Sequence, residues 1–238
     1  MRKITPKKSS VGTQKTIHGF SVINPKNFSA LIKKSGVGNF QKLSPPLPIE
    51  TYLKKKLTPH ERRELLFAPR VEAIPFKNPR GGRFTGFRCR YKNGVLIFAL
   101  LPGNMLPVCA EFRHGCERVM LNLPAGLIEP NDKSPKIRAG KEFEEEIGIS
   151  LKKLIPLNSG GVPMDARVLT RKNFFFLGIP KKPLVVQKQK THAGEFVARF
   201  LIRLEDWLEF MKLGMVDDCS ITGTLFALEK LNQLHKPK

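Results

Sequence analysis

Strand-like runs of hydrophobic residues occupy most of the chain from residue 84 onwards. Short apolar or alternating stretches predict strands over residues 87–91, 95–101, 107–112, 119–123, 167–178 and 195–204. Helical spacing predicts helices over 58–67, 135–147 and 217–234. Because strands precede and follow one central helix, the order favours an α/β fold, namely an α/β/α sandwich with a mixed central sheet.

Local signals define some of the connections. Thr58 and Glu61 have the spacing of a capping box, with Pro59 at the first helical position. The basic, glycine-bearing segment 78–82 is expected to be a turn. Asn93-Gly94 predicts a tight hairpin between the strands on either side of it.

Composition places the chain among globular proteins. Its 238 residues are 41% hydrophobic, which is enough for one sizeable core. An apolar run of about 18 residues does not occur, which argues against integral membrane association. The four cysteines form no C-x-x-C pair, so a zinc site has little support and a reducing compartment is favoured.

The charge is strongly positive, with 42 Lys and Arg against 20 Asp and Glu, a net +22. Such a surplus favours polyanions, which include nucleic acid, ribosomes, nucleotides and acidic membrane surfaces, without choosing among them. Residues 1–49 hold nine basic and no acidic residues. We therefore divide the chain into a basic N-terminal extension (1–49), a helical or turn connector (50–83) and the main domain (84–238).

Two interpretations of residues 1–49 stay open. A basic segment rich in Ser and Thr is typical of a targeting peptide for a mitochondrion or plastid. The same composition is typical of an arm that binds RNA or another polyanion in an intracellular, cytoplasmic protein.

A cluster of carboxylates lies on the expected central helix. Glu142, Glu145 and Glu146 stand at i, i+3 and i+4, so they share one face, whereas Glu144 points away from them. Phe143 and Ile147 project from a different face, towards the core. Like charges at this spacing repel, and they lie near the helix C-terminus, where the macrodipole disfavours anions. A hard divalent cation such as Mg²⁺ would resolve the conflict.

The stretch from Gly126 to Ile149 resembles the Nudix box, G-x5-E-x7-R-E-U-x-E-E-x-G-U, in which U is aliphatic. The matching positions are Gly126, Glu142, Glu145, Glu146, Gly148 and Ile149, with Lys141 where the family has Arg. The preceding Leu123-Pro124-Ala125-Gly126 and the strand motif Glu111-Phe112-Arg113 resemble the ADP-ribose and ADP-sugar pyrophosphatase branch. Residues 27–34 are similar to the N-terminal region of plant ADP-sugar pyrophosphatases.

The resemblance implies a Nudix hydrolase that splits the diphosphate of ADP-ribose or an ADP-sugar into AMP and a sugar phosphate. It implies that Glu142, Glu145 and Glu146 are catalytic and bind Mg²⁺ or Mn²⁺ together with the Ala125 carbonyl. Arg113 would clamp a substrate phosphate beside Gly126. A base on a later loop would be Asp165 or Glu195. The branch usually forms homodimers.

The chain departs from the family pattern in three places. One residue is inserted between Gly126 and Lys141, and Asp132 stands where the loop glutamate is expected. Lys141 lacks the planar fork of the family's Arg, which orients a neighbouring glutamate. Phe143 is bulkier than the usual aliphatic residue.

A second function class stays open: a weakly active or inactive Nudix module that binds RNA or a ribosomal or RNA-processing assembly. The glutamate cluster favours the enzyme, because a scaffold has no need for repelling carboxylates at a helix C-terminus. The +22 charge favours the module, because a small ADP-sugar needs few cations. The nucleobase and the sugar also stay open.

Overall fold

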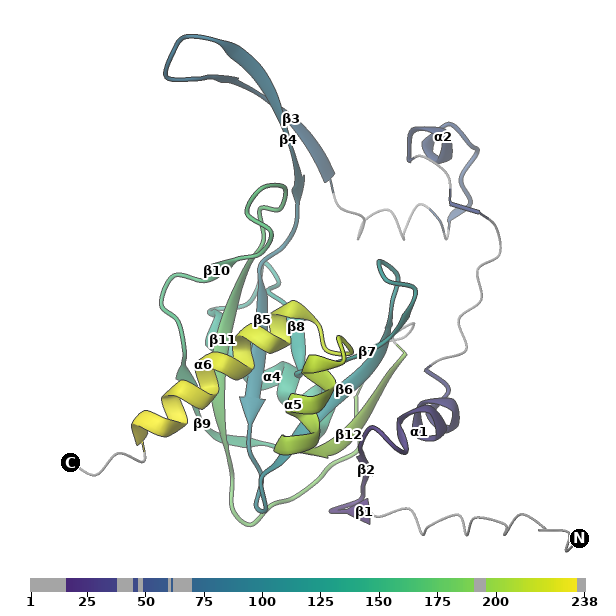
Figure 1. Cartoon of the computed structure of the whole chain (residues 1–238), viewed down its shortest axis with the longest axis vertical. Coiled ribbons are helices and arrows are strands. Elements are labelled where there is room, and N and C mark those ends of the chain that lie inside the picture. Colours follow the sequence, from purple (N-terminus) through teal and green to yellow (C-terminus); the bar gives the residue numbers. More distant parts are fainter. Residues whose placement is uncertain are drawn as a thin grey trace, which may run out of the picture.

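Two five-stranded sheets form the centre of the protein, and a two-stranded hairpin projects from them (Figure 1). The computed structural model describes residues 16–37, 45–46, 49–59, 61, 70–190 and 196–234. In the first sheet the order is β1-β2-β12-β6-β7, with β2 and β12 parallel and the other pairs antiparallel. The bounds of its strands are β1 Thr16–Ile17, β2 Phe20–Ile23, β6 Met105–Arg113, β7 Arg118–Asn122 and β12 Val197–Arg203.

The second sheet has the order β10-β11-β5-β8, with β9 also paired to β11. Strands β11 and β5 run parallel, and the remaining pairs are antiparallel. The bounds are β5 Gly94–Ala99, β8 Ala125–Leu127, β9 Leu151–Pro156, β10 Val162–Pro163 and β11 Lys172–Pro180. The projecting hairpin consists of β3 Arg70–Lys77 and β4 Arg83–Arg90.

Helices cover both faces of this strand layer, as the sequence predicted. The helices are α1 Phe28–Ser35, α2 Ile49–Leu53, α4 Pro135–Ile147, α5 Leu204–Lys212 and α6 Asp218–Leu234. Alternate residues of β5 face opposite ways, so Ile97 belongs to the same core cluster as Phe143 of α4, whereas Phe98 belongs to a second cluster with Trp207 of α5. The expected α/β/α arrangement with mixed sheets is therefore confirmed.

The sequence predicted both ends of α4. Ser134 is the N-cap, and its hydroxyl accepts a hydrogen bond from the Ile137 N–H at 3.3 Å. Pro135 begins the helix, where its missing N–H is harmless. Gly148 ends it in the left-handed conformation, with φ 78°.

The prediction of a hairpin at Asn93-Gly94 is wrong. Strand β4 pairs with β3 through the turn around Asn78, whereas β5 pairs with β11 and β8. The Asn93 side chain instead accepts a hydrogen bond from the Lys172 N–H at 2.9 Å. Gly94 lies in a closely packed position, because a Cβ there would lie 2.5 Å from Oδ1 of Asn173. The connector proposed for 50–83 likewise contains one strand of the projecting hairpin.

Part of the expected N-terminal extension belongs to the main domain. Strand β2 pairs with β12, and its Phe20 and Ile23 are buried. On α1, Leu31 and Ile32 enter the core, while Lys33 and Lys34 remain exposed. The assignment of residues 1–49 to one separate arm is therefore wrong for 16–37, and residues 1–15 lie outside the described ranges.

The capping box at Thr58 is present. The Thr58 N–H and hydroxyl donate to Glu61 Oε2 at 2.7 and 2.9 Å, and the Glu61 N–H donates to the Thr58 hydroxyl at 3.2 Å. The remainder of that predicted helix, 62–67, lies outside the described residues. Among the helices that are described, none combines the length and the apolar character needed to span a membrane.

Candidate active site on helix α4

Glu142 lies directly against the backbone of Gly126. A Cβ added to Gly126 would lie 1.5 Å from Oε1, 2.0 Å from Cδ and 2.6 Å from Cγ of Glu142. Glu142 as a whole residue is 7% exposed, so it is buried between strand β8 and helix α4. This close approach explains why glycine occupies position 126: any side chain there would displace the glutamate.

Glu146 also faces β8. Its Oε2 accepts a hydrogen bond from the Ala125 N–H at 3.0 Å and a weaker one from the Cys109 thiol at 3.6 Å. Burial raises the pKa of Glu146 well above its usual range, and the negative charges of Glu142 and Glu111 raise it further. Two neighbouring carboxylates, one on α4 and one on β6, thus act on Glu146.

The remaining helix glutamates occupy different surroundings. Glu145 is half-buried, and its backbone carbonyl accepts a hydrogen bond from the Lys190 N–H at 2.7 Å. Glu144 is exposed, as predicted. Arg199 donates hydrogen bonds to the carbonyls of Ile147 and Gln187, which places a cation at the helix C-terminus, where the macrodipole favours one.

Arg138 is a site residue that the sequence analysis missed. Its guanidinium is paired with Glu142, one helical turn later, and lies 3.9 Å from the Asp132 carboxylate. Lys141, at the position of the family's Arg, extends to Asp132 at 3.5 Å. The i,i+4 spacing from Arg138 to Glu142 was the signal that could have identified it.

Asp132 fixes the loop that precedes α4. The side chain is 4% exposed and accepts a hydrogen bond from the Glu129 N–H at 2.8 Å. That bond, with Arg138 and Lys141 nearby, lowers the pKa of Asp132. Asp132 therefore has a clear structural role in the loop that contains the one-residue insertion.

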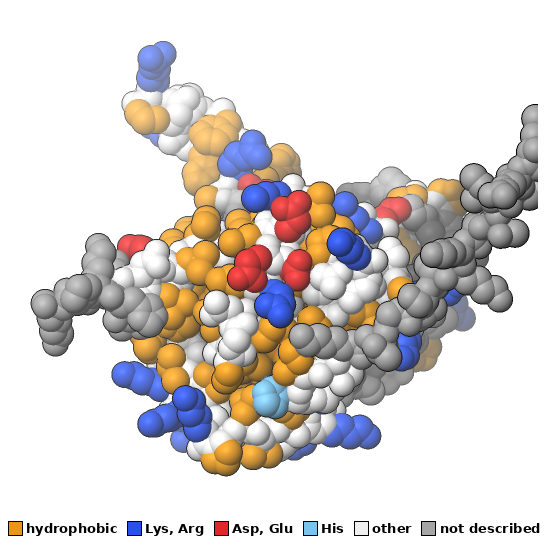
Figure 2. All heavy atoms as spheres, turned by 60° about the horizontal axis from the view of Figure 1, so that its bottom comes forward, with side chains coloured by type: hydrophobic (Ala, Val, Ile, Leu, Met, Phe, Trp, Pro, Cys, Tyr) orange, Lys and Arg blue, Asp and Glu red, His pale blue; other side chains and the backbone are white. Residues whose placement is uncertain are grey.

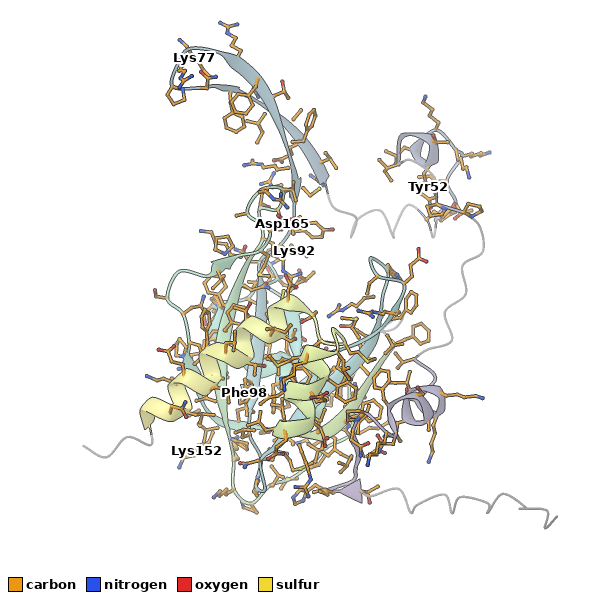
Figure 3. All side chains as sticks on the ribbon, viewed as in Figure 1. Tyr52, Lys77, Lys92, Phe98, Lys152 and Asp165 are labelled. Carbon is orange, nitrogen blue, oxygen red and sulfur yellow. The ribbon has the colours of Figure 1, made fainter. Side chains whose placement is uncertain are left out.

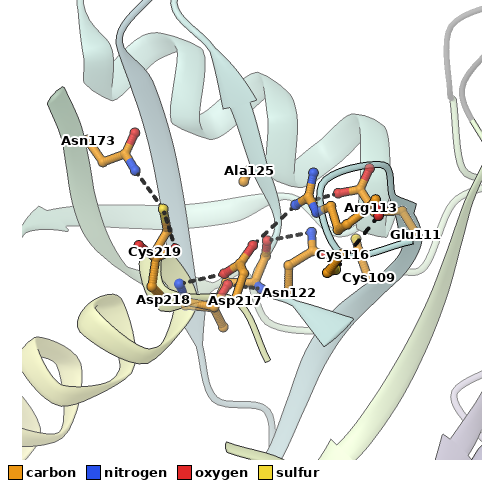
Figure 4. Close-up of polar contacts among 12 residues, drawn as sticks. Cys109, Glu111, Arg113, Cys116, Asn122, Ala125, Asn173, Asp217, Asp218 and Cys219 are labelled. Atoms are coloured by element: carbon orange, nitrogen blue, oxygen red, sulfur yellow. Dashed lines mark hydrogen bonds and ion pairs between the residues drawn. The ribbon is translucent and has the colours of Figure 1, made fainter. Parts of the chain in front are cut away.

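Arg113 lies between two carboxylates at the end of β6 (Figure 4). Its Nη2 is 2.6 Å from Oε1 of Glu111 and 3.2 Å from Oδ2 of Asp217. Asp217 also accepts the Ser220 N–H at 2.8 Å at the start of α6. The guanidinium stays 38% exposed, so it is accessible to a ligand while the two carboxylates restrict its position.

The contacts of the described residues do not connect the loop residues proposed as bases to the glutamates of α4. Asp165 lies near the base of the hairpin (Figure 3), is half exposed, and faces Arg167 at 3.7 Å. Glu195 lies outside the described residues.

The donor set fits a divalent cation, although the described residues contain no group of three His, Cys, Asp or Glu side chains already gathered for one. Glu142 and Glu146 supply hard oxygen donors on one helix face, next to the Ala125-Gly126 backbone. Burial is the main cause of the raised pKa of Glu146, and the negative charge of Glu142, although it is paired with Arg138, raises that pKa further. A bound cation would remove that repulsion.

Comparisons with known proteins agree with this architecture. A search of protein-family models found no match. The chain is 30% identical over 84 residues to an ADP-ribose pyrophosphatase of Mycobacterium tuberculosis (strain ATCC 25618 / H37Rv), an alignment that covers 35% of this chain and only 40% of that protein. It is 26% identical over 143 residues to an ADP-ribose pyrophosphatase of Bacillus subtilis (strain 168), covering 60% of this chain and 73% of that one.

A crystal structure of an ADP compounds hydrolase has the same fold. It superposes with a TM-score of 0.59 at 18% identity, covering 71% of this chain and 89% of the other. Identity that low shows the fold alone. The two sequence matches confirm the predicted relationship to the Nudix ADP-ribose pyrophosphatases, and the shared fold confirms the predicted architecture.

Proposed function

We propose that this relative of the Nudix ADP-ribose pyrophosphatases hydrolyses the diphosphate of ADP-ribose, or of a similar ADP-sugar, to AMP and a sugar phosphate. The observation that carries the proposal is the placement of Glu142 and Glu146 against Ala125 and Gly126. A binding module has no use for a glycine that makes room for a buried carboxylate. The names of the sequence relatives support the choice of ADP-ribose.

Each residue has a definite task in this mechanism. Glu142 and Glu146, with the Ala125 carbonyl and with Glu145 beside them, would hold Mg²⁺ or Mn²⁺. When bound, the metal neutralises charge on the diphosphate and acidifies the attacking water. Arg138 keeps the Glu142 carboxylate in place, a task that the family pattern gives to the Arg at position 141.

Arg113 would bind a phosphate oxygen of the substrate. Its Glu111 and Asp217 partners hold the guanidinium in advance, which reduces the entropy lost when substrate binds. An exposed, charged donor of this kind suits the diphosphate better than a buried apolar contact. Asp165 stays a candidate base only if its loop moves towards α4 when substrate binds.

Two substitutions on the same helix test the proposal. Glu142→Gln keeps the size of the side chain but removes a charge from the site, so kcat for ADP-ribose should fall by roughly 10²-fold or more. Glu144→Gln removes the same charge from the exposed side of α4 and should keep kcat within about twofold.

The assay separates AMP from ADP-ribose and from a panel of other nucleoside diphosphate derivatives, with Mg²⁺ or Mn²⁺ present. Equal activity of the two variants would remove the assignment to this face of α4. A folded wild-type protein that leaves the entire panel intact would overturn the proposed function.

A further inference from the structure

Lysine side chains surround a hollow of about 480 Å³ that lies between helix α4 and strand β9. Among the described residues that line it, five are lysines and one, Glu144, is acidic. The lysines come from α4, from β9 and from the residue directly after β11, and they are Lys136, Lys141, Lys152, Lys153 and Lys181. The proposed hydrolysis assigns no task to any of these five lysines.

Most of the positive charge around the hollow is uncompensated. All five lysines are exposed. In the part of the chain that the structure describes, only one of them forms an ion pair, which joins Lys141 to Asp132 at 3.5 Å. The middle of the face drawn in Figure 2 is different, because acidic and basic side chains lie next to one another there and their charges offset.

Apolar side chains and a helix end complete the lining. Ile137 of α4 is 45% exposed and contributes to the hollow together with Leu151 and Leu154 of β9. Helix α4 also begins here, and its first turn contains Lys136 and no acidic residue. The positive end of the helix dipole therefore adds to the charge of the lysines. The hollow offers apolar contact and an excess of positive charge in one place.

Protection of a sheet edge explains only part of this arrangement. Among the described residues, strand β9 pairs with β11 and with no second strand. Lysines on such an edge discourage pairing with another chain, which accounts for Lys153 and for Lys152, labelled in Figure 3. It does not account for Lys136 on α4 or for Lys181 after β11, which line the same hollow.

The size of the hollow and the closeness of its lysines favour a compact polyanion. A hollow of this volume is large enough for a small ligand, and ammonium groups bind phosphates as point charges. A nucleic-acid strand carries one charge per nucleotide, and an extended acidic peptide carries at most one carboxylate every 3.3 Å or so. Either would place only a few charges inside the hollow. Linked phosphates place several charges within the length of a few bonds, so they match the lysines best.

We propose that this hollow is a second anion site, which binds a compound with several linked phosphates, such as inorganic triphosphate or a nucleoside triphosphate. The lysines pair with the phosphates, and the apolar side chains beside them contact any organic part of the ligand. The catalytic glutamates proposed above and Arg113 are not among the residues that line the hollow. The proposal therefore goes beyond the proposed hydrolysis and does not depend on it.

Isothermal titration calorimetry of the full-length, metal-free protein with inorganic triphosphate tests the proposal. The wild type should bind, with an affinity that falls as salt rises, because exposed charges are screened. Lys152→Glu/Lys153→Glu should weaken binding by about 10- to 100-fold, the effect of losing one or two contacts with a charged group. Lys136→Glu/Lys181→Glu, which changes the other two parts of the lining, should weaken binding by a similar factor.

ATP in place of triphosphate separates the two sources of linked phosphates. Tighter binding of ATP would show that the apolar side chains contact the nucleoside, and equal binding would show that the phosphates alone are recognised. Either result, when it is lost in both hollow variants, supports the proposed site.

Two control variants accompany these titrations. Lys33→Glu/Lys34→Glu makes the same charge change on the exposed side of α1, across the molecule from β9 (Figure 1), and should bind triphosphate within about twofold of the wild type. Arg113→Ala removes the exposed cation of the candidate active site and should retain the binding at the hollow. Thermal melting shows whether each variant is folded.

Four results would overturn the proposal. The first is a wild-type protein that does not bind triphosphate, and the second is an equal loss of binding in the α1 control and the hollow variants. The third is binding that Arg113→Ala abolishes and both hollow variants keep, which would place the ligand in the candidate active site. The fourth is an oligoglutamate peptide that binds at least as tightly as triphosphate and is lost in the hollow variants, which would assign the hollow to an acidic polypeptide.

Discussion

Gly126→Ala should inactivate the protein while leaving it folded. The new Cβ would lie 1.5 Å from Oε1 and 2.0 Å from Cδ of Glu142, whereas non-bonded carbon atoms approach to about 3.5 Å. The carboxylate must therefore move by about 2 Å, which separates it from Arg138 and from Glu146. A misplacement of about 1 Å in a catalytic group can lower the rate by about 10²-fold, so kcat/KM for ADP-ribose should fall at least that far.

The stability change should be ordinary, about 1–2 kcal/mol, because the end of a flexible side chain moves and the backbone does not. Gly140→Ala is the matched control on α4. Its Cβ would meet only Cδ1 of Leu154, at an acceptable 3.5 Å. It should retain activity and gain about 0.5–1 kcal/mol from the better helix propensity of alanine. Steady-state kinetics and chemical denaturation measure both quantities. Gly126→Ala with more than half of the wild-type kcat/KM would refute the placement of Glu142 in the site.

Three further predictions concern the surroundings of the site. Glu146→Gln should stabilise the metal-free protein at pH 7 by about 1 kcal/mol, seen as a higher melting temperature. The pKa of Glu146 is raised in the folded state, so its contribution to stability is fully present below the unfolded-state pKa and is lost as pH rises through the folded-state pKa. The stability advantage of the variant should therefore disappear in acid. An equal advantage at every pH would contradict this cause. Arg113→Ala should raise KM for ADP-ribose by an amount equivalent to roughly 1.5–3 kcal/mol with a smaller effect on kcat, and an unchanged KM would remove its role as phosphate clamp. Deleting residues 1–37 should prevent folding, since six buried apolar side chains at about 1.5–3 kcal/mol each are comparable with the whole stability of a domain. A circular dichroism melt equal to that of the full chain would show that β2 and α1 are dispensable.

The sequence predicted the parts of the fold that depend on local signals. Helix α4 has the predicted bounds because Ser134, Pro135 and Gly148 act within a few residues of its ends. The Asn93-Gly94 hairpin failed because the partner of β5 is β11, almost eighty residues later, and pairing at that distance overrides a local turn preference. The same limit applies to β2, whose partner is β12.

The basic residues of the N-terminal segment led to the wrong assignment of residues 16–37 to a separate arm. The basic residues of α1, such as Lys33 and Lys34, are on its exposed side, whereas Leu31 and Ile32 are buried. Counting charges over the first 49 residues therefore described the surface of a folded element as though it were a separate arm.

Helix periodicity predicted the part of the candidate site that lies on α4. That rule placed Glu142, Glu145 and Glu146 on one face, and it could also have identified Arg138. The pairing of Arg113 with Asp217 joins residues 104 positions apart, so only the three-dimensional structure reveals it. The coupling of Glu111 to Glu146 depends likewise on the packing of β6 beside α4.

The most direct test of the central claim is binding of Mn²⁺ to the metal-free protein, followed by electron paramagnetic resonance, which detects the free ion. The wild type and the Glu144→Gln control should remove Mn²⁺ from solution equally well, and Glu146→Gln should bind it much more weakly, because it lacks a carboxylate of the proposed site. Addition of Mg²⁺ should release the bound Mn²⁺ from the wild type, since both ions prefer the same oxygen donors. If Glu146→Gln binds Mn²⁺ as tightly as the wild type does, the carboxylates of α4 are not the metal site.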